Sequence, residues 1–101
     1  MGAPFRLTPE ADSQLGEILE FIAEDNEAAA VRVRNALYEA FVMLANMPEI
    51  GHSREDLTER PLKFWSVYSY LLVYDPATER LTVVAVLHGA RDVERLLKSG
   101  E

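Results

Sequence analysis

Five basic or titratable side chains in the second half of the chain have the clearest chemical potential. They are Arg54, Arg60, Lys63, His88 and Arg91. A cluster of cations can stabilise the negative charge that a phosphoryl group gains during transfer, and a histidine can move a proton near neutral pH. The alternative is that the arginines form ion pairs with the acidic residues around them, which are Glu55, Asp56, Glu59 and Asp92.

These residues flank three predicted β-strands. The segments Leu62–Val67, Tyr70–Asp75 and Leu81–Leu87 are rich in valine, leucine and aromatic residues, which suit a pleated and largely buried surface. The segment Asp75–Arg80 contains a proline after an aspartate and predicts a turn between the last two strands. The chain leaves the third strand through His88–Asp92, where a glycine permits a tight bend.

Four aromatic residues are concentrated in the same region, namely Trp65, Tyr68, Tyr70 and Tyr74. Exposed rings of this kind can stack on nucleic-acid bases, whereas buried ones contribute to the core. Even spacing puts Tyr70 and Tyr74 on the same face of a strand, so we expect at least part of this group to be structural.

Two amphipathic helices are predicted before these strands. Thr8 is a favourable N-cap and Pro9 suits the first helical position, and the apolar periodicity continues to about Asp25. Asp25 or Asn26 then caps a second helix, which ends at Met47–Pro48. Because the connection is so short, the two helices must form an antiparallel hairpin.

The remaining segments complete the predicted fold. Phe5–Leu7 has the alternation of a short edge strand, and Glu49–Pro61 is a polar linker. Apolar residues at Val93, Leu96 and Leu97 predict a short C-terminal helix. We therefore expect one α+β domain over residues 1–101, in which an N-terminal strand and a helical hairpin pack on a small antiparallel sheet.

Composition excludes several classes of function. The chain has 101 residues, no cysteine and a formal charge of −7, so thiolate metal sites, disulfide frameworks and thiol nucleophiles are absent. Its two histidines lack metal-ligand spacing, and we expect no metal and no cofactor. Binding to nucleic acid needs a basic surface, so we expect no direct sequence-specific contact with it. The apolar runs are too short for a membrane span, which favours a cytoplasmic protein.

Five short motifs in a fixed order resemble the ParE/RelE superfamily, the toxins of bacterial type II toxin–antitoxin modules. The resemblance covers Leu7 to about Leu97 and is greatest for the ParE, or plasmid-stabilisation, branch. The motifs are Leu7-Thr8-Pro9-Glu10-Ala11, Pro48-x-x-Gly51-x-x-Arg54, Arg60, Tyr70-Leu71-Leu72-Val73-Tyr74 and Val86-Leu87-His88-Gly89-Ala90-Arg91-Asp92.

The resemblance implies a toxin that inhibits DNA gyrase, and thereby replication, unless a ParD-like antitoxin binds it in a hetero-oligomer. The residues expected to contact the target are Arg54, Arg60, Trp65, His88 and Arg91. Apolar surface on the second helix and on the sheet is expected to contact the antitoxin. The residues assigned to that contact are Val31, Tyr38, Val42, Leu71 and Val73.

Two alternatives remain open. The RelE branch implies a ribosome-dependent mRNA endoribonuclease, whose catalytic residues here would be His88, Arg91, Arg60 and Lys63. The strands carry Trp65, Val67, Leu71 and Leu72 where that branch usually has lysine and arginine, which favours the non-enzymatic interpretation. The second alternative is a toxin fold that has lost its activity and serves as a binding module.

Overall fold

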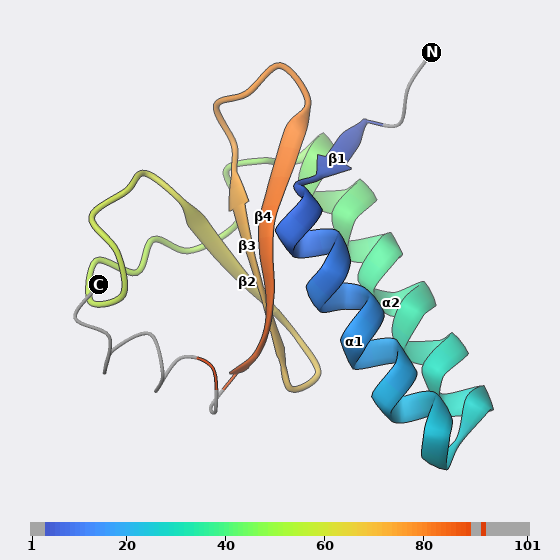
Figure 1. Ribbon diagram of the computed structural model, residues 1–101. Helices are drawn as coiled ribbons and strands as arrows, with labels where there is room; N and C mark the ends of the chain where they lie inside the picture. Colours follow the sequence, from blue (N-terminus) through green and yellow to red (C-terminus); the bar gives the residue numbers. More distant parts are fainter. Residues whose placement is uncertain (1–3, 90–91, 93–101) are drawn as a thin grey trace.

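The computed structural model describes residues 4–89 and residue 92 (Figure 1). The elements in chain order are β1 (Phe5–Leu7), α1 (Pro9–Asp25), α2 (Glu27–Asn46), β2 (Lys63–Val67), β3 (Tyr70–Asp75) and β4 (Leu81–His88). This α+β arrangement confirms the predicted fold class. The C-terminal helix predicted around Val93, Leu96 and Leu97 lies outside the described residues.

The four strands form one sheet in the order β1-β4-β3-β2. The strands β2, β3 and β4 are antiparallel neighbours, and one end of the sheet aligns Val67 with Tyr70 and Tyr70 with His88. The strand β1 lies at the edge, as predicted, but it runs parallel to β4 and pairs Phe5 with Leu81. The sheet is therefore mixed rather than purely antiparallel, because no tight turn connects these two strands and fixes their relative direction.

Local sequence signals determine where both helices begin. The side chain of Thr8 accepts a hydrogen bond from the backbone N–H of Ala11, and a proline follows at the first helical position. The side chain of Asn26 accepts from the backbone N–H of Ala29 and caps α2. Since Asn26 is the single residue between the helices, they fold back on each other as the predicted hairpin.

The helical hairpin covers one face of the sheet and buries the main core there. Figure 1 shows α1 and α2 side by side on the β1–β4 side of the sheet. Three aromatic rings join α2 to β1, because Phe5 lies 5.2 Å from Phe41 and 6.0 Å from Tyr38 between ring centroids. The largest side chains with almost no exposure in this core are Leu37, Phe41, Leu44, Leu72, Tyr74, Val83 and Val86.

A second, smaller core lies on the opposite face of the sheet. Leu57 and Leu62, from the linker between α2 and β2, pack on Phe64, Leu71 and Val73. The linker has little regular structure, but the backbone of His52 pairs with Phe64 at the edge of β2. The second face of the sheet is therefore partly covered by a segment that carries no helical or strand periodicity.

Candidate functional site

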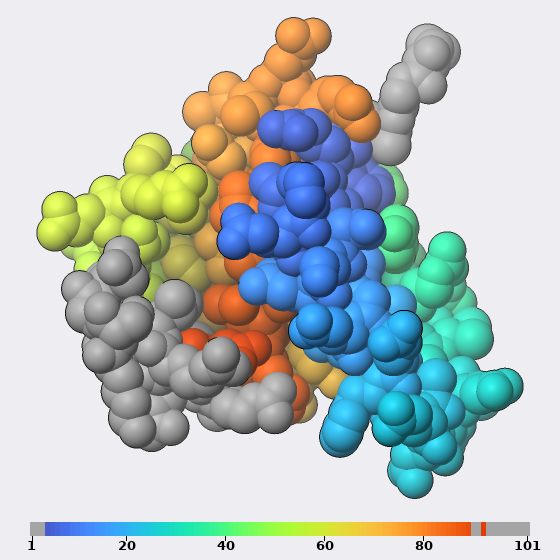
Figure 2. Space-filling view, viewed as in Figure 1, coloured from blue at the N-terminus to red at the C-terminus, as the bar shows by residue number. Residues whose placement is uncertain are grey.

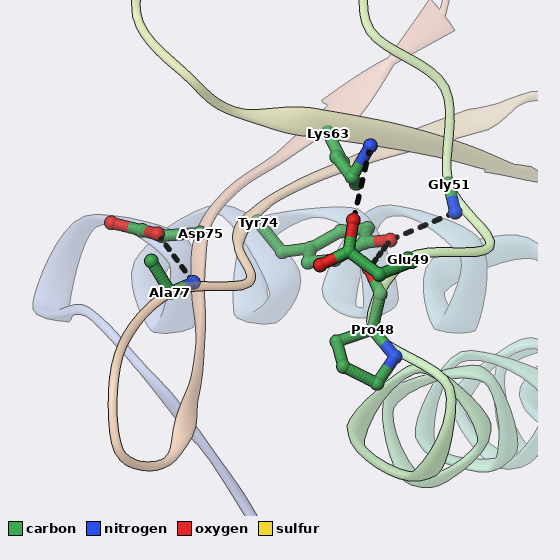
Figure 3. Close-up of polar contacts among 7 residues, drawn as sticks. All are labelled: Pro48, Glu49, Gly51, Lys63, Tyr74, Asp75 and Ala77. Carbon is green, nitrogen blue, oxygen red and sulfur yellow. Dashed lines mark hydrogen bonds and ion pairs between the residues drawn. The ribbon is translucent and has the colours of Figure 1, made fainter.

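The buried phenol of Tyr74 anchors the linker that carries several of the predicted site residues. Its hydroxyl donates to the carbonyl oxygen of Pro48 at 2.8 Å and accepts from the backbone N–H of Gly51 at 3.0 Å (Figure 3). Burial is the main cause that raises the pKa of this phenol. The motif Pro48-x-x-Gly51 therefore has a structural role that the sequence analysis did not assign.

Lys63 lies at the start of β2, beside this anchor. Its Nζ atom is 3.7 Å from Oε1 of Glu49 (Figure 3). This loose ion pair joins β2 to the segment that follows α2. In the register of the sheet, Lys63 pairs with Tyr74, whereas His88 pairs with Tyr70, four residues further along β3. Four residues of strand span roughly 13 Å. Lys63 and His88 thus lie near opposite ends of the sheet.

Arg54 forms an ion pair with Asp56, as one of the two interpretations predicted. Its Nε and Nη2 atoms donate to the two carboxylate oxygens at 3.0 and 2.9 Å. This hydrogen bonding raises the pKa of Arg54 and lowers that of Asp56. Because both side chains are substantially exposed, the pair orients the guanidinium group more than it stabilises the fold.

His88 is the last residue of β4, and its side chain lies on the face of the sheet that the helices cover. Its ring meets the ring of Tyr70 edge-on at 5.7 Å, and its backbone N–H donates to Oδ2 of Asp92 at 2.6 Å. Its Nδ1 atom is buried and makes no hydrogen bond to the described residues. The next residue, Gly89, donates from its backbone N–H to the carbonyl oxygen of Ser69 at 2.7 Å.

The described members of the basic set do not converge on one point. Arg54 lines a shallow hollow of about 310 Å³ with Tyr70, Leu71 and Gly89. His88 lines a different hollow, beside α1, and Tyr70 borders both. Arg60 is exposed in the linker, and Arg91 lies outside the described residues.

Trp65 is half-buried on β2 and is stacked on an imidazole. Its ring lies parallel to that of His52, with centroids 6.1 Å apart and an angle of 8° between the planes. The tip of the β2–β3 turn instead exposes Tyr68, which is 70% accessible and has a φ of 54°. Tyr68 is therefore more accessible than Trp65, although only Trp65 was predicted to contact the target.

The residues assigned to antitoxin contact fall into two groups. Val31 and Val42 lie on α2 and are 55% and 43% exposed, which leaves them accessible to a partner. Tyr38 packs on Phe5 and Phe41 in the core. The guanidinium group of Arg34 lies over the Tyr38 ring, 5.1 Å from its centroid. Leu71 and Val73 are buried and pack with Leu57 and Leu62 of the linker, so little of either side chain is accessible to a partner.

A groove of about 1050 Å³ lies between the C-terminal half of α1 and the ends of β3 and β4. Figure 2 shows this part of α1 on the surface beside β4. The side chain of Phe21 lines the groove and is 76% exposed. Phe21 was not predicted as a site residue, although a large apolar residue outside the apolar stripe of α1 was the available signal. The described lining residues are Gln14, Glu17, Ile18, Phe21, Ile22, Asp25, Asn26, Ala29, Tyr70, Val86, Leu87, His88 and Asp92.

Two other features are absent from the described part of the chain. No three histidine or acidic side chains there are grouped so that they could hold a metal ion. No helix there is long and apolar enough to cross a bilayer.

Comparison with known proteins identifies the family. The profile of the ParE toxin of the type II toxin–antitoxin system parDE matches residues 5–93. The chain belongs to this family. A comparison with curated protein sequences gives no match.

A solved structure supports the same fold for this ParE-family toxin. The chain is similar to a protein of the chromosomal ParDE toxin–antitoxin system from P. aeruginosa, with a TM-score of 0.68 at 12% sequence identity. The alignment covers 84% of this chain and 94% of the other. At this identity the similarity establishes the shared fold, and the family profile supplies the assignment to toxins of type II modules.

Proposed function

We propose that this ParE-family toxin inhibits DNA gyrase in the bacterial cytoplasm and is neutralised by a ParD-like antitoxin. The main support is the dispersal of the basic side chains. Arg54 is held by Asp56, Lys63 lies beside Glu49, and roughly 13 Å of strand separates the row of Lys63 from that of His88. Cleavage of a phosphodiester without a metal requires such groups to converge on one phosphoryl group.

The net charge supports a protein target over a nucleic acid. With a formal charge of −7, the toxin lacks the excess of cations that would release counterions from a phosphate backbone. The residues proposed to contact gyrase are Arg54, Arg60, Trp65, His88 and Arg91. Of these, His88 ends β4, and Arg54 lines a hollow with the next residue, Gly89.

The antitoxin is proposed to cover the apolar surface of the helical hairpin. Phe21 on α1 and Val31 and Val42 on α2 are large apolar side chains that remain exposed. Exposed apolar surface next to a groove is typical of sites that bind a peptide segment of another chain. Masking of this surface in a hetero-oligomer explains how a partner could hold the toxin inactive.

One observation favours the ribonuclease alternative. The Nδ1 atom of His88 is buried without a hydrogen-bond partner, and such an atom at a strand exit is available for proton transfer after a rearrangement. Under this alternative, His88 would act with Arg91, Arg60 and Lys63. The rearrangement would have to bring Lys63 and His88 together from opposite ends of the sheet.

Controlled expression in bacteria tests the proposal. Induction of the toxin should stop DNA synthesis and growth, and primer extension on cellular mRNA should show no new cuts. Co-expression of the product of the neighbouring antitoxin gene should restore growth. Codon-positioned mRNA cuts with continued DNA synthesis would establish the ribonuclease instead, and unchanged growth would indicate a binding module without toxic activity.

A further inference from the structure

We propose that the groove beside α1 takes a basic amphipathic helix from the partner, with an apolar stripe flanked by lysine or arginine. This inference rests on the proposed function, because it specifies the chemistry of the antitoxin segment that the groove would bind. It goes beyond that function by assigning the sign of the charge on the segment and its approximate length.

The floor of the groove is apolar and suits the stripe of a helix. Ile18 and Ile22 from α1 face Tyr70 and Val86 from the sheet, and all four line the groove. Phe21 stands at the groove with 76% of its surface exposed. An exposed aromatic ring beside an apolar floor provides the kind of anchor that dominates the binding energy of an interface.

The length of the groove sets the length of the occupant. Its lining runs along α1 from Gln14 to Asp25 and then reaches Ala29 at the start of α2. Twelve residues of α-helix span about 18 Å, so a partner helix of about three turns fills the groove. A helix laid along another helix matches this shape, whereas an added strand would need a free sheet edge.

The charges at the groove all have the same sign. Glu17, Asp25 and Asp92 line it, and no lysine or arginine does so among the described residues. Glu17 and Asp25 are exposed and form no ion pair within the described part of the chain. The helix α1 contains six acidic residues and no basic one, and two of the six, Glu17 and Asp25, line the groove.

Two uncharged polar side chains of the groove, Gln14 and Asn26, are already engaged in the fold. The Oε1 atom of Gln14 accepts from the backbone N–H of Val86 at 2.8 Å, and the side chain of Asn26 caps α2. The exposed charged groups that a partner can reach are the carboxylates of Glu17 and Asp25. A lysine or arginine on the partner would pair with them, whereas an acidic side chain would be repelled.

Binding of two matched synthetic peptides tests this inference. Each is a labelled helix-forming peptide of about fourteen residues with a leucine stripe along one face. One carries lysine beside the stripe, and the other carries glutamate at the same positions. Fluorescence anisotropy with the purified toxin should show about tenfold tighter binding of the lysine peptide at low ionic strength, and added salt should reduce this ratio.

Substitutions in the toxin separate the groove from general charge attraction. The double variant Glu17→Gln with Asp25→Asn should bring the affinity ratio of the two peptides close to one. The matched control, Asp12→Asn with Glu39→Gln, removes two exposed acids that do not line the groove and should leave the ratio unchanged. Phe21→Ala should weaken both peptides, whereas Met47→Ala, at an exposed apolar residue that does not line the groove, should not.

Three results would overturn the inference: equal or tighter binding of the glutamate peptide, failure of both peptides to bind, or equal effects of the two double variants. None of these results would bear on the target of the toxin. Failure of the proposed function would appear instead as growth without arrest, or as cuts in mRNA, when the toxin is expressed alone.

Discussion

The hydroxyl of Tyr74 donates a hydrogen bond to the carbonyl oxygen of Pro48 at 2.8 Å. The same hydroxyl accepts from the backbone N–H of Gly51 at 3.0 Å, so one side chain satisfies two groups of the chain just after α2. Tyr74 is fully buried near the end of β3. This contact joins the helical hairpin to β3 and sets the start of the linker that carries Arg54 and Arg60.

Tyr74→Phe should destabilise the protein by about 1–3 kcal/mol, because it leaves the Pro48 carbonyl and the Gly51 N–H without their partner. Urea denaturation followed by circular dichroism measures the change in the free energy of unfolding. Tyr68→Phe is the matched control, since Tyr68 is 70% exposed at a turn, and it should change stability by less than about 0.5 kcal/mol. Equal effects of the two variants would show that the buried hydroxyl contributes little.

Gly51→Ala should also destabilise the protein, by about 1–3 kcal/mol. A Cβ atom at Gly51 would lie 2.3 Å from the hydroxyl oxygen of Tyr74, so the ring or the linker must shift. Gly16→Ala on α1 is the opposite case, because nothing lies within 4 Å of the added atom. Its expected effect in the same urea titration is a gain of about 0.5–1 kcal/mol from helix propensity. Destabilisation by both substitutions would contradict this account.

Stability should decrease as the pH rises above about 10. Burial raises the pKa of the Tyr74 phenol above its ordinary value of 10.0, so the folded state retains a proton that the unfolded state loses. The stabilising contribution is therefore complete below pH 10.0 and is lost as the pH rises through the pKa of the folded state. Thermal melting between neutral and alkaline pH should show a steeper loss for the natural protein than for Tyr74→Phe. Parallel losses would refute the assignment to Tyr74.

The substitution Lys63→Gln separates the two toxic mechanisms. Lys63 is a catalytic residue only in the ribonuclease alternative, and it lies beside Glu49 at the far end of the sheet from His88. We therefore predict that Lys63→Gln retains growth arrest. Arg91→Ala, at a proposed gyrase-contacting residue, should abolish arrest while circular dichroism shows an unchanged fold. Loss of arrest in Lys63→Gln with the fold intact would favour the ribonuclease.

Local features of this fold could be predicted from sequence, because short-range interactions determine them. Thr8 and Asn26 cap their helices within three residues, and a proline follows the end of α2. The strand Tyr70–Asp75 has the predicted bounds, and β4 extends one residue beyond its predicted end. These elements depend on neighbours in sequence, so their residue types were sufficient.

Long-range relationships could not be predicted in the same way. The parallel pairing of Phe5 with Leu81 joins segments that no short turn connects. The burial of Leu71 and Val73 depends on Leu57 and Leu62, which lie in a linker without periodicity.

The candidate site was the least predictable part for the same reason. The sequence shows that Lys63 and His88 belong to the same stretch of chain. It does not show how far apart the folded sheet places them. Phe21 was missed because an exposed residue of α1 acquires its place in the groove only when the sheet packs beside it.

The most direct test of the central claim is a supercoiling assay with purified DNA gyrase and the purified toxin. Relaxed plasmid, gyrase and ATP are mixed with increasing amounts of toxin, and the supercoiled product is measured on a gel. The account predicts that supercoiling falls or that cleaved DNA accumulates, and that Arg91→Ala prevents this effect. Full supercoiling at every toxin concentration, together with codon-positioned cuts in ribosome-bound mRNA, would contradict it.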